Sequence, residues 1–162
     1  MLRRSSQSTF VRICPEPNPD FRVMELALEW GVRVLADQLV ILVAEDDQEI
    51  QIIVEDSLTE GGFEPAIAPS GEEAVTLLKG NKGSYRALVV DVNLRGRMDG
   101  WEVAKHAREI DPEFPVIYMT GAGADKWPSL GVPNSILLEK PFAPAQLVTA
   151  VSQLLISRTP KA

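Results

Sequence analysis

The chain of 162 residues contains one cysteine, Cys14, and therefore cannot form an internal disulfide. A single cysteine fits a reducing compartment without requiring one. No stretch approaches the ~20 continuous apolar residues of a membrane span, and the start MLRRSSQSTFVRIC lacks the apolar segment of a secretory signal. We therefore predict a cytoplasmic protein that has no membrane-spanning segment and no membrane partner.

The sequence also lacks an excess of positive charge. Its formal net charge is −7, and an acidic protein repels the phosphate backbone of nucleic acids. We predict no nucleic-acid partner and expect cations and proteins instead. With 45% hydrophobic and 24% charged residues, the composition is typical of one globular domain, which at this size needs neither disulfides nor a structural metal.

The first 38 residues carry no visible chemistry. They contain Arg and Ser, then the turn-rich PEPNPD, then a weakly amphipathic stretch, FRVMELALEWGVRVLADQ. We interpret residues 1–38 as an N-terminal extension, weakly structured or forming a short helix, residues 39–157 as the folded domain, and residues 158–162 as a C-terminal tail. A partner-binding arm, a loosely ordered extension and a start site at Met24 all stay open for the first segment.

From residue 39 onward, short apolar runs alternate with segments of helical spacing. The runs lack an alternating polar face, which is typical of parallel strands covered on both sides by helices. They are LVILVA, FEPAIA, ALVVDV, FPVIYMT and SILLE. The helical faces are Ile50, Ile53, Val54 and Leu58; then Val103, Ala104, Ala107 and Ile110; and finally Leu147, Val148, Val151, Leu154 and Leu155.

The pattern predicts an α/β fold, a doubly wound five-stranded parallel sheet of order 2-1-3-4-5 with five helices. Pro65 cannot donate a hydrogen bond to a neighbouring strand, so we place the second strand at an edge of the sheet. The first and third strands are then neighbours at the point where ligands bind in such sheets. The weakest helix is GADKWPSLG, where Pro128 leaves room for only a short run.

Acidic side chains follow the first apolar run at once. In VAEDD, Glu45 and Asp46 come directly after the strand, and we interpret Asp47 as a helix N-cap. The third run places Asp91 at the end of the neighbouring strand. An unpaired cluster of three carboxylates is costly where water is partly excluded. Hard divalent cations with oxygen ligands would balance it, so Glu45, Asp46 and Asp91 predict a Mg²⁺ site.

Two further polar groups reach the same rim of the sheet. The fourth run ends in Thr120, and the fifth leads to Lys140 followed by Pro141. A carboxylate nucleophile, Mg²⁺, an ammonium and a hydroxyl donor match what phosphoryl transfer requires, because they align the phosphoryl group and neutralise its charge.

With these motifs, residues 38–157 resemble the receiver domain of two-component response regulators. The matching pieces are the acidic pair in VAEDD, the acceptor in VVDVNL followed by MDGWEVA, the Thr in VIYMTG and the Lys-Pro in EKPF. GGFEPAIAPSGEEAV is similar to the family's second strand and helix. The resemblance implies a flavodoxin-like receiver fold of the single-domain, chemotaxis-regulator type.

The resemblance implies a role for each matching residue. Asp91 would accept a phosphoryl group from the phosphohistidine of a histidine kinase or a histidine phosphotransfer protein. Asp46 would bind Mg²⁺ directly, Glu45 directly or through water, Asp91 through a carboxylate oxygen and Asn93 through its backbone carbonyl. These residues form the predicted metal site.

The remaining implied roles concern the phosphoryl oxygens. Lys140 would contact them, and Thr120 would move to donate a hydrogen bond to them. The peptide bond between Lys140 and Pro141 is expected to be cis, which is accessible before proline.

The chain departs from the family pattern in two places. The loop 91–99, DVNLRGRMD, is one residue longer than the commonest spacing, which predicts altered access beside the metal. Leu137 stands where many receivers carry an aromatic switch residue that moves together with Thr120. A leucine offers neither a ring nor a phenolic hydroxyl, so it cannot provide the ring motion or the hydrogen bond of the usual coupling.

Other residues receive plainer interpretations. We interpret His106 as a solvated side chain on a surface helix rather than as a phosphodonor. Trp101 and Trp127 are expected to make packing or partner contacts. GAGAD, residues 121–125, lacks the acidic residue downstream of a dinucleotide-binding motif and is read as a loop.

The leading hypothesis is a stand-alone phosphorylation switch acting on an unknown downstream protein, or a phosphate shuttle in a relay, because only a few residues follow the last helix. It would not be an enzyme beyond its own phosphotransfer and slow self-dephosphorylation. A receiver-like interaction module that never uses phosphorylation is one alternative. A phosphatase of the haloacid dehalogenase type is another, although its nucleophile lies in a D-x-D pair on the first strand, and no such pair occurs here.

Overall fold

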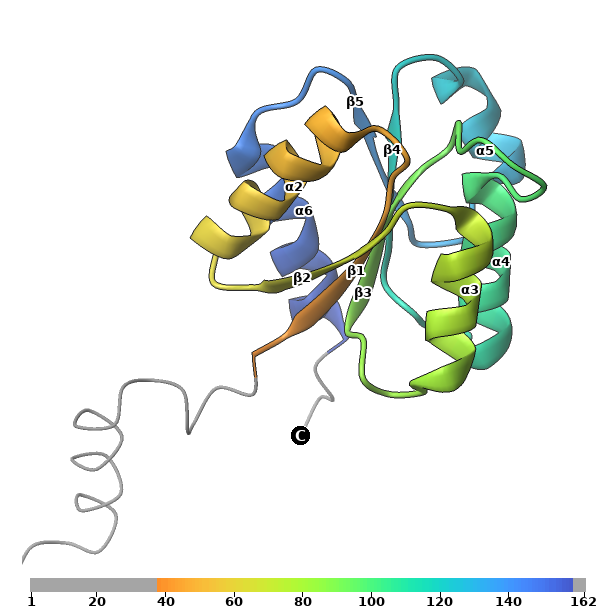
Figure 1. Ribbon diagram of the computed structural model, residues 1–162, viewed down its shortest axis with the longest axis horizontal. Coiled ribbons are helices and arrows are strands. Elements are labelled where there is room, and N and C mark those ends of the chain that lie inside the picture. Colours follow the sequence, from red (N-terminus) through yellow and green to blue (C-terminus); the bar gives the residue numbers. More distant parts are fainter. Residues whose placement is uncertain (1–37, 159–162) are drawn as a thin grey trace, which may run out of the picture. The chain divides into compact units, whose positions relative to one another are not determined.

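A computed structural model describes residues 38–158 of the chain (Figure 1). The predicted extension and tail therefore lie almost wholly outside the described residues, and their boundaries stay predictions. Within residues 38–158, no helix combines the length and the apolar character that crossing a lipid bilayer would require.

The centre of the domain is a parallel sheet of five strands, in the order β2-β1-β3-β4-β5. This confirms the predicted fold class and strand order. The register is regular; for example, Val43 of the first strand faces Ile67 of the second and Val89 of the third. The strands are β1 (Val40–Ala44), β2 (Glu64–Ala68), β3 (Ala87–Asp91), β4 (Val116–Thr120) and β5 (Ile136–Glu139).

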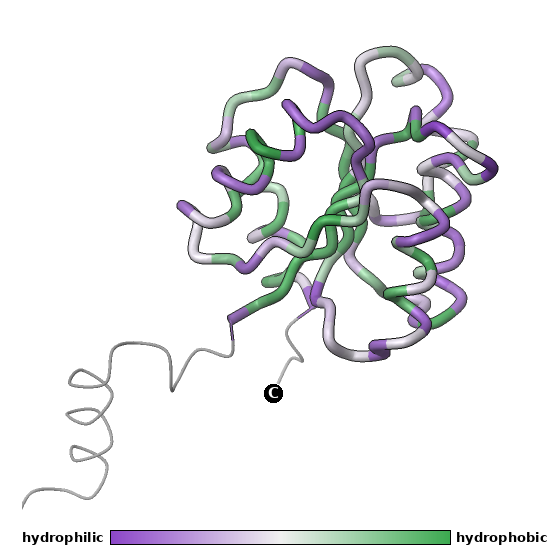
Figure 2. The backbone as a smooth tube through the Cα atoms, in the orientation of Figure 1, coloured by the Kyte–Doolittle hydropathy of each residue, from purple (hydrophilic) through white to green (hydrophobic). Residues whose placement is uncertain are grey.

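The three central strands are hydrophobic on both sides because both faces of the sheet are covered. Every residue of β3 and β4 is buried, and four of the five residues of β1 are buried. β2 pairs only with β1, so Pro65 lies on an edge strand, as predicted. Figure 2 shows the hydrophobic colour concentrated in the sheet and the hydrophilic colour on the outer turns of the helices.

Helices form a layer on each face of the sheet (Figure 1). One layer packs on a core that contains Ile41, Val89 and Met119, and the other packs on a core that contains Leu42, Val90 and Tyr118. The first layer consists of α2 (Gln48–Glu60) and α6 (Pro144–Ser157); the second consists of α3 (Gly71–Gly80), α4 (Gly100–Ile110) and α5 (Trp127–Leu130). The weakest predicted helix is indeed short, a single turn preceded by the 3₁₀ turn Ala124–Lys126.

Polar side chains cap the starts of α2 and α4. Asp47 caps α2 by accepting hydrogen bonds from the backbone N–H groups of Glu49 and Ile50, which confirms its predicted role. Asp99 and Glu102 form a capping box at the start of α4. Because α4 begins directly after the loop that follows β3, this cap also ends that loop.

The predicted buried face of α2 is wrong at one position. Ile53 is 50% exposed, whereas Ser57 is buried between Val54 and Leu58. The serine hydroxyl donates to the backbone carbonyl of Ile53 at 2.6 Å, so its burial leaves no polar atom unpaired. The buried face of α2 therefore includes Ser57, and Ile53 lies on the exposed face.

Candidate functional site

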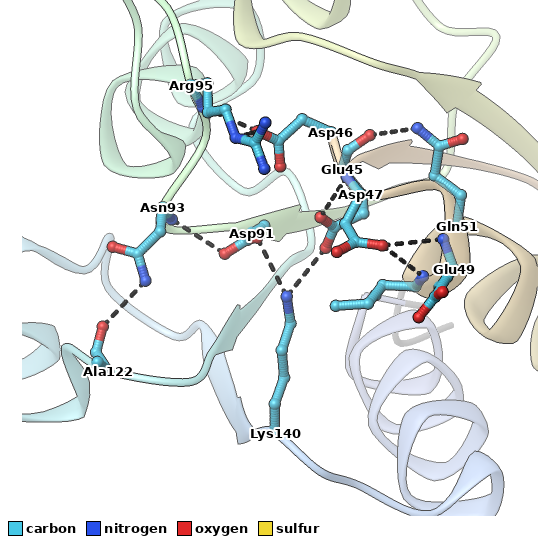
Figure 3. Close-up of polar contacts among 11 residues, drawn as sticks. Glu45, Asp46, Asp47, Glu49, Gln51, Asp91, Asn93, Arg95, Ala122 and Lys140 are labelled. Atoms are coloured by element: carbon cyan, nitrogen blue, oxygen red, sulfur yellow. Dashed lines mark hydrogen bonds and ion pairs between the residues drawn. The ribbon is translucent and has the colours of Figure 1, made fainter.

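Three carboxylates gather at the carboxyl ends of the central strands (Figure 3). Glu45 and Asp46 directly follow β1, and Asp91 is the last residue of β3. Parallel neighbouring strands end at the same edge, so these side chains converge. One oxygen from each carboxylate lies within 4.8 Å of the others. The structure thus brings together the acidic residues that the sequence predicted as metal ligands.

Lys140 places a cation between two of these carboxylates. Its Nζ lies 3.0 Å from Glu45 Oε2 and 3.1 Å from Asp91 Oδ2. The backbone N–H of Lys140 donates to the Thr120 carbonyl at 2.8 Å, which holds the lysine beside the end of β4. The Lys140–Pro141 peptide bond is cis, as expected.

Glu45 lies in the least solvated part of the site. Its side chain is fully buried, and its Oε1 accepts a hydrogen bond from the Asp47 backbone N–H at 3.0 Å. Burial, and secondarily the charge of Asp91, raise the pKa of Glu45 from 4.5 to about 7 against the opposing effects of Asp47 and Lys140. Burial opposes the charged form of Lys140, but its hydrogen bonds to Glu45 and Asp91 outweigh burial and raise its pKa.

The raised pKa of Glu45 predicts a stability that falls with pH. Between about pH 4.5 and pH 7 the folded chain keeps a proton that the unfolded chain has lost. The free energy of unfolding of the native chain, relative to that of Glu45→Gln, should therefore fall by about 3 kcal/mol across this window. Urea unfolding of both proteins in EDTA measures the difference.

An exposed variant, Glu60→Gln, controls for the change from carboxylate to amide. A gap between the native chain and Glu45→Gln that stays constant across the window would contradict the predicted pKa.

Asn93 joins the loops that follow β3 and β4. Its backbone N–H donates to Asp91 Oδ1 at 2.9 Å, and its side-chain amide donates to the Ala122 carbonyl at 3.1 Å. These bonds hold the residue beside the carboxylate cluster. The backbone carbonyl of Asn93 as a metal ligand stays a prediction.

Thr120, the last residue of β4, contributes a hydroxyl to the same rim. The residue is 1% exposed, and its Oγ1 has no hydrogen-bond partner among residues 38–158. A buried hydroxyl without a partner is unfavourable, so a ligand oxygen bound here would satisfy it. Carboxylate oxygens, one ammonium and a free hydroxyl together fit Mg²⁺ and a phosphoryl group.

The predicted switch position lies beside an aromatic pair. Leu137 of β5 faces Tyr118 of β4 in the sheet register, and the Tyr118 ring packs on Trp101 with centroids 4.7 Å apart. The Tyr118 hydroxyl accepts a hydrogen bond from the Val132 backbone at 3.1 Å.

Trp127 donates its indole N–H to the Ser135 hydroxyl at 3.0 Å. Trp101 lies in the hydrophobic core and Trp127 packs against that core, so both make packing contacts, one of the two kinds of contact expected.

Sequence reasoning missed one residue of the site, Arg95. Its backbone N–H and its Nε lie 3.2 Å and 3.3 Å from the same oxygen, Asp46 Oδ2. The only signal in the sequence was a loop one residue longer than usual that carries two arginines. His106 lies on α4 and pairs with Glu109 at 3.2 Å, outside the site.

Comparisons with known proteins agree with this geometry. A family model described as the response regulator receiver domain matches residues 41–152. The response regulator receiver protein CpdR of Brucella abortus is 30% identical over 119 residues, which are 72% of this chain and 97% of that protein. The transcriptional regulatory protein PcoR of Escherichia coli is 32% identical over 117 residues, 71% of this chain and 50% of that protein.

A solved structure is also similar to this chain. The crystal structure of a response regulator receiver protein from Sinorhizobium medicae WSM419 shares 44% identity with a TM-score of 0.73 and covers 76% of this chain and 98% of that one. The chain spans about half the length of several curated relatives, including PcoR. The strand order, the acidic rim and these matches lead to one assignment: the chain belongs to the response regulator receiver domain family of two-component systems.

Proposed function

We propose that Asp91 accepts a phosphoryl group from the phosphohistidine of a histidine kinase or a histidine phosphotransfer protein, in a reaction that depends on Mg²⁺. The observation that carries this proposal is the convergence of three groups at one rim: the Asp91 carboxylate, the Lys140 ammonium and the Thr120 hydroxyl, which has no partner in the described part of the chain. No single strand supplies more than one of them.

In the proposed transfer, a carboxylate oxygen of Asp91 forms a bond to phosphorus while the bond between phosphorus and the imidazole nitrogen breaks. The imidazole nitrogen keeps the electron pair. With a proton from water on its other ring nitrogen, the imidazole leaves as a neutral histidine, and Asp91 becomes an acyl phosphate. Lys140 already contacts Asp91 and would neutralise charge on the phosphoryl oxygens, and the Thr120 hydroxyl would donate a hydrogen bond to one of them.

The residues that would hold the metal are Glu45, Asp46, Asp91 and the backbone carbonyl of Asn93. Receiver domains bind Mg²⁺ at such an acidic pocket, and the oxygen ligands here suit a hard cation. When bound, Mg²⁺ supplies positive charge opposite the phosphoryl oxygens. Asp46 is the most accessible of the three carboxylates, with 16% of its side chain exposed, and would meet an incoming ion first.

The output is proposed to be a protein contact made or broken on phosphorylation. A downstream protein partner is part of this proposal. Relatives such as PcoR are transcriptional regulators that extend beyond the segment matched here. Leu137 in place of an aromatic residue favours a route that does not depend on a swinging ring. Beyond its own phosphotransfer and slow self-dephosphorylation, we propose no enzymatic turnover.

The test is phosphoryl uptake from acetyl phosphate, followed by intact mass. With Mg²⁺ the native chain should gain one phosphoryl group, and with EDTA it should gain almost none. Asp91→Asn should gain none, because the amide cannot act as the nucleophile. Asp125→Asn, at an exposed position, is the matched control and should behave as the native chain does.

Two results would remove this proposal: an unchanged mass for the native chain, or equal uptake by Asp91→Asn. An unchanged mass together with phosphorylation-independent partner binding would favour the interaction module. Steady multi-turnover hydrolysis of phosphomonoesters would favour the phosphatase.

A further inference from the structure

The loop between β3 and α4 lays an arginine against the acidic rim (Figure 3). The Arg95 Nε lies 3.3 Å from Asp46 Oδ2, and the Arg95 side chain is 88% exposed. The backbone N–H of the same residue donates to the same oxygen at 3.2 Å. Asp46 therefore already has a cationic partner before any metal arrives.

Two cations pair with the three carboxylates of the rim. Lys140 contacts Glu45 and Asp91, and Arg95 is the one cation in the described part of the chain that forms an ion pair with Asp46. Lys140 is held by two carboxylates and is 18% exposed. Arg95 has one carboxylate partner and reaches it from solvent, so it is the cation that a metal displaces more easily.

The loop does not need the guanidinium to keep its position. The backbone N–H of Arg97 donates to Glu72 Oε1 at 2.8 Å, and the backbone N–H of Arg95 holds Asp46 independently of its side chain. The guanidinium therefore adds charge beside Asp46 but is not required to orient the carboxylate.

We propose that Arg95 is a built-in competitor of Mg²⁺ at Asp46 and sets the magnesium affinity of this receiver. Without metal, the guanidinium neutralises Asp46. Binding of the divalent cation breaks this ion pair, because both cations claim the same carboxylate. The inference rests on the proposed magnesium site, and it adds a residue that tunes how much Mg²⁺ must be present before Asp91 is ready to react.

The test compares the Mg²⁺ dissociation constants of the full-length native chain, Arg95→Gln and Arg97→Gln, measured by isothermal titration calorimetry at one ionic strength. Arg95→Gln should bind Mg²⁺ about two- to fivefold more tightly, the range expected for removing one exposed ion pair. Arg97→Gln removes the same charge two residues away and should change the affinity clearly less. The gain of Arg95→Gln should shrink in high KCl because salt screens the pair.

A second readout follows the ion pair itself. In the native chain, saturation with Mg²⁺ should shift the Nε–Hε resonance of Arg95 in a ¹⁵N-edited spectrum and leave that of Arg97 nearly unchanged. The reference is the same protein in a solution without Mg²⁺ that is adjusted with KCl to the same ionic strength.

The outcomes separate this inference from the proposed function. If the native chain binds no Mg²⁺, both fail. If it binds Mg²⁺ but Arg95→Gln binds with equal or weaker affinity, only the competition is overturned. Equal gains by Arg95→Gln and Arg97→Gln would also overturn it, since they would show a general effect of net charge, as would an Arg95 resonance that saturation does not move.

Discussion

Replacing Lys140 with methionine should slow phosphoryl uptake from acetyl phosphate by about 10²- to 10³-fold, the usual loss when a preorganised charge-stabilising donor is removed from a reacting centre. The Lys140 Nζ lies 3.1 Å from the Asp91 carboxylate, where it would neutralise charge on the phosphoryl oxygens in the proposed transfer. Methionine is a similarly long, unbranched side chain without the charge. The rate is measured by intact mass against time at saturating Mg²⁺.

Lys79→Met makes the same substitution at an exposed position of α3 and should leave the uptake rate unchanged. Circular dichroism of Lys140→Met under the conditions of the uptake assay verifies that the variant is folded. A folded Lys140→Met protein that is phosphorylated at the native rate would contradict the role proposed for this lysine.

Gly100→Ala should lower the free energy of unfolding by about 3 kcal/mol, the upper part of the range for overpacking a filled site. An added Cβ would lie 2.2 Å from the Asp91 carbonyl oxygen and 2.7 Å from Val92 Cα. Both atoms belong to the backbone, so no side-chain rotation can relieve the clash. The first turn of α4 would have to move away from the end of β3, which carries the proposed phosphoacceptor.

Chemical denaturation measures this loss, and Gly80→Ala provides the control. Gly80 ends α3, and a Cβ there would meet nothing within 4 Å. Its replacement should leave stability unchanged or raise it by up to about 1 kcal/mol, since alanine loses less backbone entropy in a helix. Equal stabilities for Gly100→Ala and the native chain would contradict the close packing of α4 on β3.

Local patterns were sufficient for the arrangement of the strands. Uninterrupted apolar runs separated by helical segments predict a covered parallel sheet, and Pro65 alone places β2 at its edge. In such a sheet the strand ends share one rim, so a residue's place at a strand end predicts its neighbours. Glu45, Asp91 and Lys140 could be grouped from the sequence for this reason.

Patterns were less informative about the helix faces. Ile53 shares the helical spacing of Val54 and Leu58 but is half exposed, and Ser57 is buried in its place. Periodicity ranks side chains by polarity. It does not account for a serine hydroxyl that donates a hydrogen bond to a carbonyl of its own helix, which can be buried at little cost.

The sequence by itself determined the fold class and the group of carboxylates, lysine and threonine at one rim, because both follow from periodicity and from positions at strand ends. The strand order followed from Pro65 together with the known topology of doubly wound sheets. Only the tertiary structure decided that Arg95 pairs with Asp46 and that the Thr120 hydroxyl finds no hydrogen-bond partner within residues 38–158. The path of a loop across the rim, and the atoms that a buried hydroxyl can reach, depend on contacts between residues far apart in the chain. No local pattern encodes such contacts.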